Sequence, residues 1–388
     1  MRVFKIFSLA ILFVFAPLSL FAEFYSSSYY GWNFDLPEGF VIKDASDDGL
    51  SFYMEHEFMK VRAAIKMYPL ESYQRSDLAM EEVLNKLNAD GEIDGFVWNG
   101  RQASIAQYEF KLPGNDTPQA GWGLSVTTVA KPVHLVFLCY ADKSVADDCQ
   151  QFILSAVDSL CVEKKDFRLP GPITSYAFNS GDAKNVLLKI GGKDIYAQIL
   201  SQAKDSGRFV IDREFSVLTL YAKQRQWKEA WQRYYRTIFR EAYSRLDNAA
   251  DMIHASIKTE AMSKAPQNPN VEICKKLLAW VQDFDYQRKQ DTSDFNDLTS
   301  VLQNLGSDCD SRALLLCVLM EHFGVKTELF VSGIYSHALF GVDLPGQGAR
   351  IRVDGTDYLL CETTAPVNMG LVAKDHSETA NWIPVDLP

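Results

Sequence analysis

The sequence lacks the patterns that mark a metal site, a nucleic-acid surface or a second membrane segment. Its 6 histidines are dispersed, and neither a Cys-x-x-Cys nor a His-Glu-x-x-His motif occurs, which argues against a bound metal. Lysine and arginine form no basic stripe and are outnumbered, 39 to 50, by acidic residues, so nucleic acid is not an expected partner. Beyond the N-terminus, no apolar run is long enough to span a membrane.

The first residues, MRVFKIFSLAILFVFAPLSLFAEF, have the composition of a secretory signal peptide. Arg2 and Lys5 give a basic start, residues 6–16 are almost wholly apolar, and Ala22 is a small residue suited to cleavage. We therefore expect residues 1–22 to be removed and the mature protein to be soluble, either periplasmic or secreted. The alternative is that the signal stays uncleaved as an anchor. The rest of the chain is long enough for two or three domains.

The cysteines do not form a disulfide framework. The chain has 7 of them, an odd number, at positions 139, 149, 161, 274, 309, 317 and 361, so at least one thiol stays free or pairs between chains. Cys139 lies in VFLCY and Cys317 in ALLLCVLM, where a cysteine usually acts as a small buried hydrophobic residue.

Residues 23–162 show the pattern of an α+β sandwich on a mainly antiparallel sheet. YYGWNFDLP and VRAAIKM alternate apolar and polar positions as strands do, whereas residues 76–91 and 153–160 have helical spacing. The order of these elements, and an aromatic first strand ending in LPEGF, resemble the PsbP-like family. No acid/base or metal cluster occurs here, so we expect this domain to serve recognition or anchoring, with a protein as its partner.

Residues 163–270 are predicted to be a linker followed by a helical connector. EKKDFRLPGPI contains Pro170, Gly171 and Pro172, which are typical of a linker, and residues 205–262 follow helical spacing with many aromatic side chains. A carbohydrate-binding aromatic stripe is one interpretation, but packing against the next domain is the better one. After KAPQNPN, Asn270 can cap the next helix, VEICKKLLAWVQDF.

Residues 306–316, GSDCDSRALLL, place a cysteine between two aspartates at the start of an apolar helix. Every residue from 313 to 320 is apolar, so this helix should be buried on all sides and end at Gly324. With Ser307 or Asp308 as N-cap, Cys309 lies in the first turn, where free N–H groups and the helix dipole favour a thiolate. Asp308 and Asp310 oppose that charge, so a cationic partner is needed.

A histidine and an acid follow on the predicted strands. His337, in IYSHALFGVDL, can take the thiol proton, and it needs an acceptor at its other ring nitrogen. The candidates are Glu362 in YLLCETTAP, Asp354 in the turn sequence VDGT, and Asp386 in NWIPVDLP. By spacing alone, a capped core helix and a polar strand end explain these residues equally well.

Four segments together resemble the transglutaminase-like cysteine proteases and amidases of bacteria. They are AWVQDFDYQRKQDTSDFNDL, SDCDSRALLLCVLMEHFGV, SHALFGVDLP and YLLCETTAP, in the family's order. The resemblance implies a papain-like catalytic domain over residues 271–388. It also implies acyl transfer through a thioester without any cofactor, with Cys309 as nucleophile, His337 as general base and Glu362 as orienting acid.

The sequence departs from the family pattern in two places. Ser307 stands where glycine is usual, and Glu362 stands where aspartate is more familiar, which keeps Asp386 open as a rival for the third role. The N–H of Cys309 is one oxyanion donor. The second donor stays open among three residues upstream of the cysteine, namely Gln282, Tyr286 and Gln303.

The side chains at the helix start are expected to form a local pair, Arg312 with Asp310.

The expected substrate is a protein, a peptide or a cell-wall peptide, and hydrolysis is favoured because no acceptor amine site is evident. Two alternatives are kept. One is a true transglutaminase that joins amines to glutamine side chains, and the other is a catalytically silent module that binds peptides or cell-envelope fragments.

Overall fold

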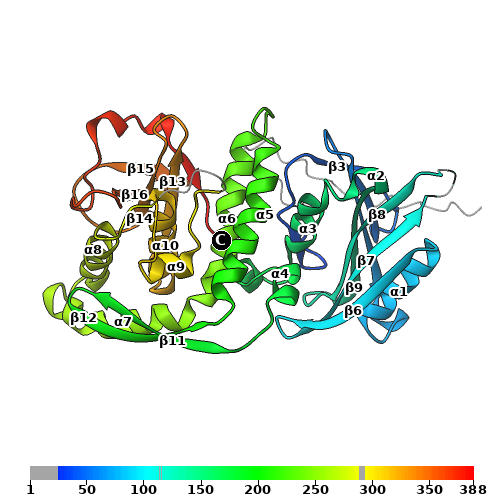
Figure 1. Cartoon of the computed structure of the whole chain (residues 1–388), viewed down its shortest axis with the longest axis horizontal. Coiled ribbons are helices and arrows are strands. Elements are labelled where there is room, and N and C mark those ends of the chain that lie inside the picture. The colour runs from blue at the N-terminus through cyan, green and yellow to red at the C-terminus, as the bar shows by residue number, and fades with distance from the viewer. Residues whose placement is uncertain (1–24, 113, 115, 288–292) are drawn as a thin grey trace, which may run out of the picture.

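The protein is α+β, with two lobes on either side of a pair of long helices (Figure 1). The computed structural model describes residues 25–112, 114, 116–287 and 293–388, so the predicted signal peptide lies outside the described residues. Within these ranges, no helix is both long and apolar enough to cross a membrane.

The N-terminal lobe is built on an antiparallel sheet with a helix on each face. In β9(Val133–Asp142), Val136, Leu138 and Tyr140 pack with α1(Ser76–Lys86). Leu135 and Phe137 of the same strand pack with α3(Gln150–Asp158). Because neighbouring residues of a strand point to opposite faces, the two helices cover opposite sides of the sheet. The predicted combination of helices with an antiparallel sheet is confirmed. The strand order is β3(Phe40–Ala45), β4(Ser51–His56), β5(Val61–Pro69), β9(Val133–Asp142), β8(Pro118–Thr127), β7(Arg101–Lys111) and β6(Asp90–Trp98), and the helices are α1(Ser76–Lys86) and α3(Gln150–Asp158).

Short elements complete this lobe. A small antiparallel sheet joins the start of the described chain to the end of the lobe and has β2 in its centre. The short elements are β1(Tyr25–Ser27), β2(Trp32–Phe34), β10(Leu160–Cys161), α2(Lys143–Ala146) and η1(Leu70–Ser72).

The region between the lobes is largely helical, as predicted, but it also contains a β-hairpin that was not expected. In β11, Val186, Leu188 and Ile190 are buried while Leu187 and Lys189 are exposed, which is strand alternation. The hairpin lies along the bottom of Figure 1. The elements here are η2(Lys164–Arg168), α4(Pro172–Ala177), β11(Ala183–Ile190), β12(Lys193–Leu200), α5(Ala203–Thr219), α6(Trp227–Arg245) and α7(Asp247–Lys264).

The expected linker at residues 163–173 is packed against the N-terminal lobe. Asp166 is fully buried and accepts hydrogen bonds from Asn99 and Arg101 of the β6–β7 turn. Pro172 begins α4 rather than a free connection, since proline is well suited to a first helical turn.

The C-terminal lobe packs three helices against an antiparallel sheet. The N-cap residue of its first helix is Asn268, so the prediction of Asn270 is wrong. Pro269 already occupies the first helical position. The helices are α8(Pro269–Gln282), α9(Leu298–Leu302) and α10(Cys309–His322). The strand order is β15(Arg350–Val353), β16(Thr356–Cys361), β14(His337–Val342), β13(Thr327–Ser332) and β17(Ile383–Val385), and two short 3-10 helices are η3(Lys374–His376) and η4(Thr379–Asn381).

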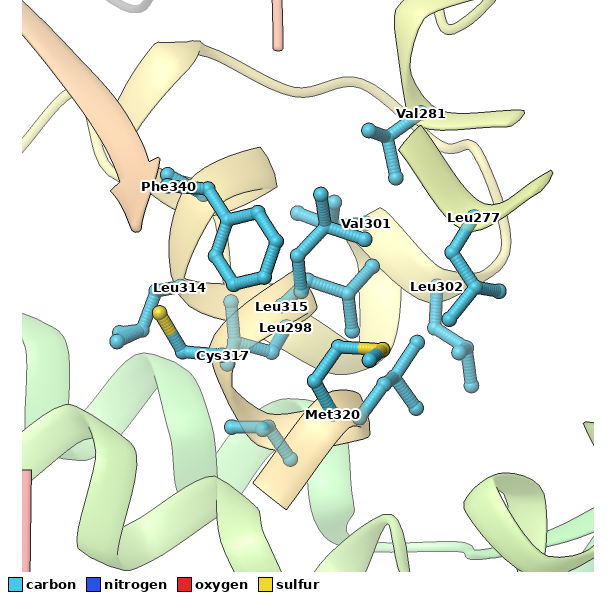
Figure 2. Packing of buried hydrophobic residues seen from close by; sticks show 14 of the residues in the cluster. Leu277, Val281, Leu298, Val301, Leu302, Leu314, Leu315, Cys317, Met320 and Phe340 are labelled. Carbon is cyan, nitrogen blue, oxygen red and sulfur yellow. The ribbon is translucent and has the colours of Figure 1, made fainter. Parts of the chain in front are cut away.

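Helix α10 is the buried centre of this lobe. Residues 313–320 are all buried, as their composition predicted, and Gly324 has the positive φ of +75° that terminates a helix. Figure 2 shows Leu314, Leu315, Cys317 and Met320 among side chains of the surrounding elements, namely Leu277, Val281, Leu298, Val301, Leu302 and Phe340. The body of α10 is therefore held by packing on all sides, which fixes the position of its start.

Buried arginines of helix α6 bind it to α5 and to the N-terminal lobe. Arg233 pairs with Glu214 of α5 and also donates to the backbone oxygen of Asp35, while Arg236 pairs with the Asp35 carboxylate. Arg240 donates to backbone oxygens of residues 158, 160, 166 and 169. Because these charges are buried, losing one partner of a pair is expected to cost several kcal/mol, about 3 to 5.

Candidate active site

Cys309 is the first residue of α10, and the local sequence fixes it there. Of the two candidate N-caps the structure uses Asp308, whose carboxylate accepts the backbone N–H of Ser311 at 2.9 Å. The Ser311 hydroxyl in turn accepts the N–H of Asp308 at 3.1 Å. Cys309 is 6 % exposed. As the first helical residue, its own N–H has no acceptor within the helix.

The thiol of Cys309 is held by its neighbour. Its sulfur donates to Asp310 Oδ1 at 2.9 Å, and the hydroxyl of Tyr235 from α6 donates to the other oxygen of the same carboxylate. Burial, together with the carboxylates of Asp310 and Asp308, raises the pKa of the Cys309 thiol, against a smaller opposing effect of the Ala338 N–H. The resting thiol is therefore protonated at neutral pH.

The expected pair between Arg312 and Asp310 does not form. Arg312 donates to the Ser307 hydroxyl at 2.8 Å and to the backbone oxygens of Phe284 at 2.7 Å and Thr363 at 3.3 Å. Residues two apart on a helix do not face each other, which explains the error. Arg312 instead fixes the segments on either side of the helix start.

His337 and Glu362 meet at the ends of two neighbouring strands. His337 is the first residue of β14, Glu362 directly follows β16, and the two strands pair with each other, with β15 beyond β16. His337 Nε2 lies 2.8 Å from Glu362 Oε2. Since an ionised carboxylate only accepts, this bond assigns the hydrogen to Nε2 and leaves Nδ1 as the nitrogen that can take a proton.

The Glu362 carboxylate is anchored from two sides. Its other oxygen accepts the backbone N–H of Thr364 at 2.8 Å and the Thr364 hydroxyl at 2.6 Å. Burial acts to raise its pKa, but the hydrogen bond and charge of His337 and the bonds from Thr364 outweigh it and lower the pKa to about 2. Glu362 is thus a fixed acceptor that orients the imidazole.

The rival acids lie elsewhere. Asp386 follows β17, which pairs with β13 at the opposite side of the sheet from β16. Burial raises its pKa, and the charges acting on it are those of Arg236, Asp354 and Lys326. Asp354 lies in the turn between β15 and β16 with a φ of +46°, in agreement with the turn sequence VDGT. The acceptor of His337 is therefore Glu362.

Cys309 and His337 line one cavity of about 170 Å³. Trp231 from α6 and Tyr286 add aromatic walls to it, and carboxylates from Asp294, Asp308 and Asp310 also line it. A larger groove of about 700 Å³ runs between the β11–β12 hairpin and α8 and contains none of the three candidate residues. The smaller cavity holds the thiol and the imidazole, so it is the site at which chemistry can occur.

The three candidate oxyanion donors have different surroundings. Gln282 donates to the backbone oxygens of Glu362 at 2.8 Å and Val367 at 2.9 Å, so it holds the acid's strand end instead of a substrate. Gln303 donates to the Thr299 oxygen and lines the larger groove. Tyr286 is the one of the three that lines the cavity.

Trp231 and Tyr235 are site residues that lie in the aromatic helix interpreted from the sequence as a packing face, with a carbohydrate-binding stripe as the alternative. Their helical spacing predicted that α6 packs on the next domain, and it does. No local pattern distinguishes a tyrosine that reaches Asp310 from one that fills a core.

All 7 cysteines of the chain are present as buried thiols.

Comparison with known proteins gives distant similarities only. No protein-family model matches the chain, and no curated protein matches it. Among solved structures, a cyanobacterial PsbP from Synechocystis is similar at 11 % identity and a TM-score of 0.31, over 38 % of this chain and 96 % of that one. The Ran-binding protein Mog1p of Saccharomyces cerevisiae is similar at 11 % identity and a TM-score of 0.26, over 34 % of this chain and 90 % of that one. A Bacteroides thetaiotaomicron protein is similar at 8 % identity and a TM-score of 0.26, over 89 % of each chain.

Proposed function

We propose that the protein is an exported cysteine-dependent amide hydrolase of the transglutaminase-like type, with a papain-like catalytic domain in its C-terminal lobe. The observation that carries the proposal is the hydrogen bond of 2.8 Å between His337 and Glu362 beside a cavity that also contains Cys309 at a helix start. A cysteine, a histidine and an orienting acid in this arrangement suit acyl transfer through a thioester.

The reaction begins when the Cys309 sulfur leaves Asp310 and gives its proton to His337. The thiolate attacks the amide carbonyl and forms a carbon–sulfur bond, with the oxyanion accepting the backbone N–H of Cys309. The carbon–nitrogen bond then breaks, and the leaving amine takes the proton from His337. Glu362 stabilises the imidazolium while it carries that proton.

Water completes the cycle. His337 accepts a proton from water as its oxygen attacks the thioester, the carbon–sulfur bond breaks, and the proton then returns to the thiolate of Cys309. The net reaction is one amide plus one water giving an acid and an amine. No metal or organic cofactor enters any step.

The proposed substrate is a protein, a peptide or a cell-wall peptide outside the cytoplasm, in the periplasm or the medium. The described residues of the N-terminal lobe include no cluster that could hold a metal ion, and we assign this lobe the recognition of a protein partner or an envelope component. Its sheet and two covering helices suit a binding role, since the rigid scaffold leaves loops and edges for contacts.

One observation favours a silent binding module as the second candidate. The thiol is protonated at rest and hydrogen-bonded to Asp310, which is the opposite of a preformed thiolate. If the sulfur cannot leave Asp310, the cavity can still hold a peptide without acting on it. Amide turnover distinguishes the two functions.

The test is a screen of the reduced mature protein against a complex peptide mixture and cell-wall peptides, with and without a fluorescent primary amine. Mass spectrometry reads new peptide termini, glutamine converted to glutamate, and amine incorporation. We expect hydrolysis products in the wild type that are lost in Cys309→Ala and His337→Ala. Cys317→Ala is the matched control, because this thiol lies in the same helix but faces the core.

Each outcome decides between the functions. Amine incorporation in place of hydrolysis identifies a true transglutaminase. Products that persist in Cys309→Ala contradict the proposal, and saturable peptide binding without any turnover supports the silent module.

A further inference from the structure

Asp310 connects the nucleophile to the helix between the lobes. One carboxylate oxygen accepts the Cys309 thiol at 2.9 Å, and the other accepts the hydroxyl of Tyr235 from α6. Tyr235 is 2 % exposed, so this hydroxyl has little access to water. A partly buried carboxylate therefore lies between the reactive sulfur and an element of the connector.

Asp310 and His337 compete for the same thiol. A carboxylate only accepts hydrogen bonds, so it stabilises the S–H form and repels a thiolate at the same position. The general base needs the opposite, a sulfur that gives up its proton. As long as the thiol donates to Asp310, it is not donating to His337.

We propose that Asp310, backed by Tyr235, is a positioning residue that holds the Cys309 thiol in a resting state until a substrate occupies the cavity. The inference rests on the proposed function and adds a resting state to it. Because Asp310 itself lines the cavity, an N–H group of a bound amide can donate to the carboxylate and displace the thiol. The sulfur is then released toward His337, and unproductive chemistry at an empty site is suppressed.

Other titratable groups in the described part of the site also enter this account. On α10, Asp308 is the N-cap, and burial together with the charge of Asp310 raises its pKa. From α6, the Tyr234 hydroxyl meets the Ser293 hydroxyl at 2.9 Å, so it is not the group that binds Asp310. Asp294 lines the cavity as a further acid, and His337 faces it from β14.

The cation nearest in sequence, Arg312, does not offset the charge of Asp310 at the thiol. The Arg312 guanidinium is engaged by the Ser307 hydroxyl and by the backbone oxygens of Phe284 and Thr363. Among the described residues, no arginine forms an ion pair with Asp310, and the hydroxyl of Tyr235 is its donor on the other side.

The position of Tyr235 depends on both lobes. The neighbouring turns of α6 carry Arg233 and Arg236, which pair with Glu214 of α5 and Asp35 of the N-terminal lobe. Movement of α6 relative to α10 would therefore change the hydrogen bond to Asp310. The resting state of the thiol is linked to how the two lobes are held together.

The test measures iodoacetamide alkylation of Cys309 by brief pulses and peptide mass spectrometry from pH 7 to pH 11.5 in the reduced full-length mature protein. Asp310→Asn keeps the size of the side chain but removes its charge, and we expect the alkylation midpoint to fall by about one pH unit or more. At a fixed pH below the midpoint, the alkylation rate rises only about threefold for each unit by which the thiol pKa falls, because a more acidic thiol is a weaker nucleophile. Asp294→Asn is the matched control for loss of a cavity carboxylate, and we expect a smaller shift.

Tyr235→Phe tests the second half of the proposal. It removes the donor that draws the Asp310 charge away from sulfur, so we expect the midpoint to rise by a few tenths of a unit. In the Asp310→Asn background the same change should have no effect, since the two residues then no longer act on the thiol together. An equal shift in both backgrounds, a fall, or no shift in either would overturn the role of Tyr235.

The inference and the proposed function can fail separately. A midpoint in Asp310→Asn that stays within about 0.3 unit of the wild type, or rises, would overturn the inference even if amides are hydrolysed. A clear fall in the midpoint without any amide turnover would leave the inference intact and remove the proposed function. Asp310→Ser serves as a second variant if the asparagine variant does not fold.

Discussion

Replacing Glu362 with glutamine should destabilise the fold in a pH-dependent way. In the wild type, one oxygen accepts His337 Nε2 and the other accepts the N–H and hydroxyl of Thr364. A glutamine has a single oxygen, so it can accept from one side only. Its amide group must then face a donor on the other side, and at least one buried donor is left without an acceptor.

The magnitude follows from the carboxyl group's pKa. Lowering it from 4.5 to about 2 corresponds to about 3 kcal/mol of stability at pH 7. Because the folded-state pKa is the lower one, this contribution is present above pH 4.5 and is lost as the pH falls toward 2. At pH 3 about half of it should remain. The side chain is 9 % exposed, so screening by solvent is small.

The assay is urea unfolding of the wild type and Glu362→Gln at pH 7, 5 and 3, with Glu82→Gln as the control. Glu82 forms an exposed pair with Lys86 at 2.8 Å, and its loss should cost less than about 0.5 kcal/mol at every pH. A Glu362→Gln difference that is equally small, or that does not shrink toward pH 3, would refute the reasoning.

Three further predictions concern the core, a buried acid and the strand end. Leu315→Ala should lower the free energy of unfolding in urea by about 2 to 5 kcal/mol, whereas Leu305→Ala, at a side chain 59 % exposed, should change it by less than about 0.5 kcal/mol. Burial raises the pKa of Glu328 from 4.5 to about 9, so the folded state keeps a proton that the unfolded chain loses. The free energy of unfolding therefore declines as the pH rises from 4.5 toward 9. Glu328→Gln should therefore be more stable than the wild type in urea unfolding at pH 8, with a gain that vanishes near pH 4; a constant difference would be inconsistent with this. Gln282→Ala should lower the kcat/KM of amide hydrolysis about tenfold without unfolding the protein, because the backbone oxygen of Glu362 then loses a hydrogen bond. An unchanged kcat/KM would show that this hydrogen bond is dispensable.

Local patterns predicted the elements whose burial repeats regularly. Alternation in residues 61–67 and the continuous apolar run at residues 313–320 each follow from one geometric period, and both elements are present as predicted. His337 and Glu362 can meet only if β15, which lies between them along the chain, is outside their two strands in the sheet. The sheet order places β15 beyond β16.

Long-range partners were beyond local patterns. The hairpin of β11 and β12 is buried by α7 and α8, and neither strand shows which helices will cover it. Asp310 was assigned to Arg312 because the two are close in sequence, although the helix points them apart. The actual donor, Tyr235, is 75 residues away, and only the packing of α6 on α10 brings it there.

The central claim is that Cys309 is an acyl-accepting nucleophile with His337 as its base. The direct measurement is a short treatment of the reduced protein with p-nitrophenyl acetate at pH 7.5, followed by acid quenching and peptide mass spectrometry. The account predicts one hydroxylamine-sensitive acetyl group on Cys309, lost with time as water hydrolyses the thioester, and nearly absent in His337→Ala. Acetylation spread over the other buried thiols, or an unchanged rate at Cys309 in His337→Ala, would contradict it.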